Sequence, residues 1–127
     1  MQLGKNGVGI RSVDDWLCQA PPAKGKAHWK DNRSAKELAK AWFPASGDPV
    51  VPDELSRLFL SSPAVGLIEF ESGEPEALVR FDDVPGEPRH SDLLLIGSCA
   101  LGRIVVSIEA KADESFGQLG RVHTRLY

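Results

Sequence analysis

The chain has 127 residues, of which 42% are hydrophobic and 26% charged, and its formal net charge is −3. This length predicts one domain with a modest core, and the negative charge argues against a general polyanion binder. Two cysteines are too few for a disulfide framework or a zinc site, and no apolar run approaches the roughly 20 residues of a membrane helix. The first residues show no signal-peptide pattern. We therefore expect a cytoplasmic protein that does not bind membranes.

The N-terminal third of the chain carries few signals of regular structure. We expect a single domain over residues 1–127, with a loosely structured N-terminal segment at 1–33 and the core in 34–127. One short helix is expected inside the N-terminal segment. It begins after Ser12, whose hydroxyl can cap it, and it carries two aspartates in its first turn, where the helix dipole favours acid.

Two helices are predicted next. Residues 34–43 open with the capping-box pair Ser34 and Glu37, and the helix ends before Pro44. Residues 52–60 predict a second helix, which starts with a proline suited to the first turn. The residues that it is expected to bury are Leu55, Leu58 and Phe59.

The hydrophobic period then changes to that of strands. Residues 65–71 and 77–81 predict a hairpin around a turn at 72–75, which contains glycine and proline. Further strands are predicted at 92–96 and 104–110, followed by a final helix at 114–127. These elements predict an α/β fold of the α+β type, with N-terminal helices, a four-stranded, mostly antiparallel mixed sheet and a C-terminal helix.

Two of the apolar strands carry charge at one end. Asp92 opens one strand, and Glu109 and Lys111 close the next, so Asp92 lies beside Glu109 if the two strands pair. Two carboxylates can hold a divalent metal and a water, and a lysine beside them can orient that water or stabilise developing negative charge. These are the groups needed to hydrolyse a phosphodiester. The alternative is that the three residues only close the strands with solvated charge, as a cross-strand ion pair.

This arrangement resembles the PD-(D/E)XK phosphodiesterase superfamily, which has the restriction-endonuclease-like fold. Asp92 matches the first acid of the motif, and Glu109-Ala110-Lys111 matches its second element; Ser91 stands where the motif name has proline. The resemblance covers roughly residues 34–127. It points to a small or truncated member, because the family's strand after its second helix has no counterpart here.

The resemblance implies a restriction-endonuclease-like core and a Mg²⁺- or Mn²⁺-dependent nuclease. The implied metal ligands are the carboxylates of Asp92 and Glu109 and the carbonyl of Ala110. Lys111 would position or polarise the attacking water. In many members a helical glutamate joins the site, and Glu37 or Glu54 could match it. For Glu37 this role competes with its role in the capping box.

Basic residues are concentrated in the first part of the chain. Eight of the 15 lysines and arginines, but only five of the 18 acidic residues, lie before residue 51. Such a cluster predicts contact with the phosphates of a nucleic acid, although a solvated loop and helix face is the alternative. The residues expected to bind nucleic acid are Lys30, Arg33, Lys36, Lys40 and His90.

The sequence thus favours a metal-dependent phosphodiesterase that acts on nucleic acid, with DNA as the expected partner. A second interpretation is a catalytically inactive module of the same fold, which binds nucleic acid or a partner protein. A third is an interaction protein that forms a homodimer, in which a second copy covers an exposed sheet edge.

Overall fold

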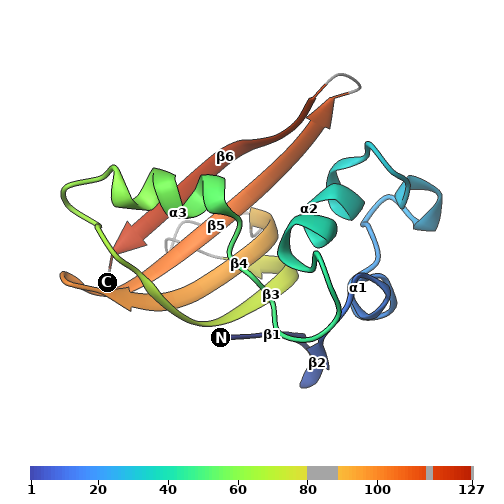
Figure 1. Ribbon diagram of the computed structural model, residues 1–127. Coiled ribbons are helices and arrows are strands. Elements are labelled where there is room, and N and C mark those ends of the chain that lie inside the picture. The colour runs from blue at the N-terminus through green and yellow to red at the C-terminus, as the bar shows by residue number, and fades with distance from the viewer. Residues whose placement is uncertain (80–88, 114–115, 127) are drawn as a thin grey trace.

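Six strands form one mixed sheet in the order β2-β1-β3-β4-β5-β6, and three α-helices precede its four long strands in the chain (Figure 1). The computed structural model describes residues 1–79, 89–113 and 116–126. The strands are β1 (Gln2–Lys5), β2 (Val8–Ile10), β3 (Glu69–Val79), β4 (Arg89–Cys99), β5 (Gly102–Asp113) and β6 (Phe116–Leu126). The helices are α1 (Val13–Gln19), α2 (Ser34–Trp42) and α3 (Asp53–Leu60), with a short 3₁₀ helix, η1, at Lys26–His28. The predicted α+β class with a mixed sheet is confirmed, but the sheet has two strands more than the four expected.

The four long strands form an antiparallel meander, in which each strand pairs with the one before it. The mixed character of the sheet comes from β1, which runs parallel to β3. This parallel ladder is short, and it joins Gln2 to Ser72 and Leu3 to Gly73. The first strand of the chain is therefore held between its own hairpin partner, β2, and a strand almost 70 residues away.

The prediction of a loosely structured segment at residues 1–33 was wrong for its first ten residues. β1 and β2 form an antiparallel hairpin, and its two turn residues, Asn6 and Gly7, have φ of 52° and 79°. An Asn-Gly pair is the commonest sequence for such a turn, because both residues tolerate positive φ. The predicted short helix is confirmed as α1, where Ser12 Oγ accepts a hydrogen bond of 3.0 Å from the Asp15 N–H.

The predicted turn at residues 72–75 was also wrong, because β3 runs unbroken from Glu69 to Val79. Gly73 serves close packing in this strand. A Cβ on Gly73 would collide with the side chains of Leu3 and Leu95, which belong to the two neighbouring strands. The glycine that suggested a turn instead permits close contacts with residues distant in the sequence.

Over the described residues 116–126, the predicted C-terminal helix at 114–127 is replaced by β6, and residues 114, 115 and 127 lie outside the described part of the chain. Backbone pairs from Ile104 with Leu126 to Asp113 with Phe116 join β6 to β5 along its length. The glycines in this segment disfavour a helix, and β5 without β6 would leave a long unpaired edge. The trailing helix implied by the resemblance to PD-(D/E)XK enzymes is therefore missing from residues 116–126.

One hydrophobic core lies between the helices and the sheet. α2 packs against β5, and Trp42 and Leu38 of this helix are buried with residues of β4 and β5. α3 adds Leu55 and Phe59, but Leu58 is 51% exposed, so its predicted burial was wrong. The buried residues of the central strands are Leu93, Leu95, Ile104, Val106 and Ile108. In the part of the chain that the structure describes, no helix has the length and apolar character to cross a membrane.

Candidate metal centre

The regular pairing of the sheet is interrupted where β3 meets the first half of β4. The ladder steps from Pro75 paired with Leu93 to Ala77 paired with Ser91, and it passes over Glu76. Glu76 has φ of 51°, which is unusual for a residue with a side chain. The ladder between β4 and β5 starts only at Leu93. The residues at this interruption are polar, in contrast to the apolar ladder beside it.

Three potential metal ligands meet at this interruption. Glu76, His90 and Asp92 each offer one ligand atom, and these atoms lie within 4.8 Å of one another. It is the one such group of three or more acidic, histidine or cysteine side chains among the residues described. The carboxylate of Glu76 also lies against Nε2 of His90, which makes an ion pair when the imidazole is protonated. The cluster combines two carboxylates with one imidazole.

Asp92 is fixed to the neighbouring strand by its own carboxylate. Its Oδ2 accepts a hydrogen bond of 2.8 Å from the N–H of Ala110, on β5. The side chain therefore takes the place of a ladder partner at the point where the β4–β5 pairing ends. A carboxylate fixed through one oxygen can offer the other oxygen to a ligand without a search through rotamers.

Both carboxyl groups of the cluster are disfavoured as anions. Burial raises the pKa of Glu76, and the nearby charge of Asp92 adds to this effect, whereas His90 and Lys5 oppose it. Burial also raises the pKa of Asp92, against the effect of the Ala110 hydrogen bond. Oε2 of Glu76 is buried, and no hydrogen bond of good geometry from the described residues reaches it. A bound cation would lower the pKa of both carboxyl groups, because its positive charge stabilises the carboxylate forms.

The cluster lines a cavity of about 300 Å³ together with a second group of residues, here called the basic wall. That wall comes from the chain between α1 and α2 and from the first residues of α2 itself. It consists of Pro22, Ala23, Lys24, His28, Arg33, Ser34 and Ala35. Arg33 is the N-cap of α2 and makes no side-chain cap hydrogen bond. Among the described residues no side chain caps the start of α2, and three basic side chains line the same cavity. Both features suit an anion.

The structure separates the sequence-predicted site residues into two groups. Asp92 and His90 belong to the cluster, and Arg33 lines the basic wall of the same cavity. Glu109 is half-buried and close enough for its charge to add slightly to the raised pKa of Asp92. Lys111 is exposed. The pairing that the sequence suggested thus brings Glu109 near Asp92, but the three-ligand cluster is formed with other residues.

Ala110 and Glu37 each make a hydrogen bond in the structure, and the ligand roles that the resemblance implied for them stay predictions. Ala110 contacts Asp92 through its N–H rather than its carbonyl oxygen. Glu37 accepts a hydrogen bond of 2.9 Å from the Asn32 N–H, and this bond is the main reason why its pKa is lowered. Glu37 therefore bonds to the residue before the N-cap of α2, and the capping box predicted from Ser34 and Glu37 is not formed. The N-cap of this helix is Arg33, and the predicted cap Ser34 is its first residue.

The remaining basic residues predicted to bind nucleic acid lie outside the residues that line the cavity. The Nζ atoms of Lys36 and Lys40 lie 3.2 Å and 3.4 Å from Oδ1 of Asp31. These ion pairs partly neutralise the exposed face of α2. Lys30 is exposed. Of the five predicted residues, Arg33 and His90 are the two that line the cavity.

Sequence reasoning missed Glu76. Its position between Pro75 and Ala77 suggested a boundary between a turn and a strand. Its role depends on the register that places it across from Asp92, which no local pattern reveals. The only available signal was an acidic residue inside an otherwise β-like segment.

The ligand set has its own metal preference. Carboxylates and an imidazole suit Mn²⁺, Fe²⁺ or Zn²⁺ as well as or better than Mg²⁺, which prefers oxygen ligands and bound waters. Mn²⁺ is therefore the better choice of the two ions that the sequence suggested.

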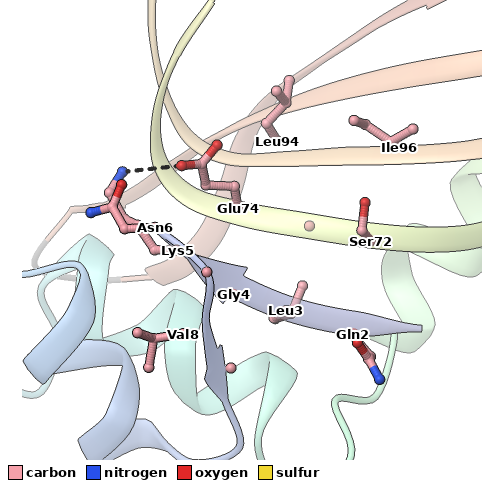
Figure 2. A pocket seen from close by; sticks show the side chains of 13 residues that line it. Gln2, Leu3, Gly4, Lys5, Asn6, Val8, Ser72, Glu74, Leu94 and Ile96 are labelled. Atoms are coloured by element: carbon pink, nitrogen blue, oxygen red, sulfur yellow. Dashed lines mark ion pairs between the residues drawn. The ribbon is translucent and has the colours of Figure 1, made fainter.

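A second hollow, of about 470 Å³, lies on the sheet beside the β1–β2 hairpin (Figure 2). Leu94 and Ile96 of β4 line it together with residues of β1, β2 and β3. Lys5 and Glu74 form an ion pair there, with Nζ and Oε1 3.7 Å apart. This hollow has no set of three metal ligands among the described residues, so we place the candidate centre in the smaller cavity.

Comparison with known families and structures adds one assignment. Comparisons with curated proteins and with solved structures gave no significant match. A family model described as a domain of unknown function, DUF6946, matches residues 9–126, which include every residue of the candidate centre. The chain therefore belongs to the DUF6946 family.

Proposed function

We propose that this protein is a metal-dependent phosphodiesterase that acts on nucleic acid, with Glu76, His90 and Asp92 as metal ligands. One observation carries the proposal: the cluster and the residues of the basic wall line one and the same cavity. A metal alone would fit many functions. A metal site that shares its cavity with Lys24, Arg33 and a helix N-terminus suits a ligand that is itself an anion, and a phosphate group is such a ligand.

The basic wall would bind the phosphate, and the cluster would hold the metal. Arg33 and Lys24 would hold the phosphate, and the planar guanidinium of Arg33 is suited to two-point contact with its oxygens. His28 is the group on the same wall that can give a proton to a leaving oxygen. A divalent ion, when bound, neutralises charge on the phosphate and lowers the pKa of a coordinated water.

The proposal keeps the reaction class implied by the resemblance to PD-(D/E)XK enzymes, with DNA as the first substrate to test. It also keeps Asp92 as a ligand. It differs in the partners of Asp92, because it assigns to Glu76 and His90 the positions that the resemblance gave to Glu109 and a helical glutamate. Lys111 has no task in this version of the site.

Cleavage of plasmid and single-stranded DNA with Mn²⁺ or Mg²⁺ tests the proposal. The variants Asp92→Asn and Glu76→Gln keep side-chain volume but remove a charged ligand. Loss of a group that merely supports a ligand typically lowers metal affinity about 10–100-fold, so we expect at least this loss of Mn²⁺ affinity and of cleavage. Glu69→Gln is the matched control, since it neutralises an exposed carboxylate at the other end of β3.

Lys111→Ala separates the two versions of the site. Unchanged cleavage by Lys111→Ala, with loss in Glu76→Gln, would support the cluster described here. The opposite pattern would favour the Asp92, Glu109 and Lys111 triad. Absence of cleavage and of Mn²⁺ binding in the wild-type protein would overturn the proposal.

The contact between His90 and Glu76 favours a second candidate function. A protonated imidazole balances part of the acidic charge without any metal. The cluster would then be structural, and the protein would be a catalytically inactive module that binds nucleic acid through the basic wall. This candidate predicts binding of a labelled oligonucleotide without added metal, measured by fluorescence anisotropy, and its loss in Arg33→Ala.

A further inference from the structure

Lys5 reaches from β1 to the segment of β3 that carries Glu76. Its Nζ donates hydrogen bonds of 2.9 Å to the carbonyl oxygen of Pro75 and of 2.7 Å to that of Glu76. The same Nζ lies 3.7 Å from Oε1 of Glu74, and the Lys5 side chain is only 19% exposed. Figure 2 shows this ion pair at the edge of the larger hollow. One ammonium group thus contacts three consecutive residues of β3.

These contacts occur beside Glu76, the residue that the β3–β4 ladder passes over between Pro75 and Ala77. The β1–β3 ladder includes Leu3 with Gly73, and Lys5 continues the connection between the two strands through its side chain. Glu76 is in the left-handed region, which is unfavourable for a residue with a Cβ unless its surroundings hold it there. Two charge-assisted hydrogen bonds to the carbonyls around this residue supply such a constraint.

We infer that Lys5 is a positioning residue, which holds Glu76 in the conformation that directs its carboxylate toward His90 and Asp92. The inference rests on the proposed function, because it takes Glu76 to be a metal ligand. It extends the site to β1, a strand that lies outside residues 9–126 of the family match. The aliphatic part of Lys5 and its charge have separable effects, and this makes the inference testable.

The charge of Lys5 and its positioning role predict opposite results for cation binding. A positive charge near the cluster repels a cation, so its removal alone would leave Mn²⁺ affinity unchanged or increase it. Removal of a positioning contact should instead weaken Mn²⁺ binding, by about 10–100-fold for a group that supports a ligand. The sign of the change therefore identifies which effect dominates.

The experiment is calorimetric titration of the full chain with MnCl₂. Lys5→Met keeps most of the aliphatic side chain and removes the ammonium group, and we expect about 10–100-fold weaker binding. Lys5→Arg restores a donor with positive charge and should recover most of the affinity. Lys26→Met is the control, because it removes the same charge from an exposed lysine on η1. Thermal unfolding of each variant shows that binding is measured on folded protein.

The outcomes distinguish failure of the inference from failure of the proposed function. If the wild-type protein binds no Mn²⁺, the proposed function fails. If the wild-type protein binds Mn²⁺ and Lys5→Met binds it equally well or more tightly, the inference alone fails. If Lys5→Met does not fold, Lys5→Gln is titrated instead. Its shorter amide cannot reach both carbonyls as lysine does, and wild-type affinity in this variant would equally overturn the inference.

Discussion

The two halves of β4 differ in how they are held and in what they carry. From Leu93 to Ser98 the strand pairs with β3 on one edge and β5 on the other, and its buried side chains are apolar. Before Leu93, His90 and Ser91 pair with β3, whereas Asp92 has no ladder partner and reaches β5 through its carboxylate. A complete ladder leaves side chains free to pack a core. An interrupted ladder needs side-chain partners, and it places titratable groups together at partial burial.

Leu95→Ala should produce the largest loss of stability, because it acts on the fully paired half. Leu95 is completely buried and belongs to the core between the helices and the sheet. Truncation of a buried leucine leaves a cavity and typically costs about 2–5 kcal/mol. Urea unfolding measures this cost. A loss in stability below about 1 kcal/mol would mean that the fully paired half of β4 is not tightly packed in the core.

Asp92→Ala should have the second largest effect, because it leaves the partly buried N–H of Ala110 without its partner. An unsatisfied group of this kind costs about 1–3 kcal/mol. Asp92→Asn is the matched variant, since its amide oxygen can still accept this hydrogen bond. Urea unfolding of both variants without metal is the measurement. Equal stability of the two would show that the bond to β5 contributes nothing to the fold.

The polar half should also make stability depend on pH in a defined direction. Burial raises the pKa of Glu76 in the folded protein, so the folded state binds this proton more tightly than the unfolded state. The favourable contribution is complete below the ordinary pKa of a glutamate, about 4.3, and it is lost as the pH rises through the raised value. Asp92 acts in the same direction.

We therefore expect Glu76→Gln to become more stable relative to the wild-type protein as the pH rises across this interval, and to stay so above it. Urea unfolding from about pH 4 to about pH 8, without divalent metal, measures the difference. Mn²⁺ should narrow this difference at high pH, because it stabilises only the wild-type ligand set. A difference that is independent of pH would contradict the raised pKa of Glu76.

Ser107→Ala should have the smallest effect. Ser107 Oγ donates a hydrogen bond of 2.8 Å to Ser91 Oγ, which in turn donates one of 3.0 Å to the carbonyl oxygen of Leu93. The variant removes the first bond and keeps the second, so we expect a loss of about 0.5–1.5 kcal/mol. Unfolding measurements on Ser107→Ala and Ser107→Cys would show how much this hydroxyl pair contributes by joining the first half of β4 to β5. A gain in stability would argue against it.

The sequence predicted the elements that depend on local signals. Caps and prolines located the three α-helices, and apolar runs located β4 and β5. Gly73 led to a wrong prediction of a turn. Its small size instead allows close packing against Leu3 and Leu95, which are distant in the chain. The segment of β6 was assigned to a helix because its strand character comes from the free edge of β5.

In the candidate site, too, the sequence predicted only the residues that carry a local signal. Asp92, His90 and Arg33 were found because acid or base stood out at a strand end, in a loop or in a basic cluster. Glu76 was not found because its role requires the β3–β4 register and a left-handed backbone, neither of which a local pattern encodes.

The parallel contact of β1 with β3 has a consequence for the order in which the protein is assembled during synthesis. Lys5 and Pro75 are 70 residues apart in the chain. At about 5–20 residues per second, a ribosome makes this stretch in about 4–14 s, so the first strand emerges well before its partner exists. A two-stranded hairpin is at best marginally stable alone. We therefore expect β1 and β2 to stay largely unstructured until β3 and its neighbours have formed. Although β1 and β2 leave the ribosome before β3, they would therefore be among the last elements of this fold to take their place, and the cluster around Glu76 would be completed at that moment.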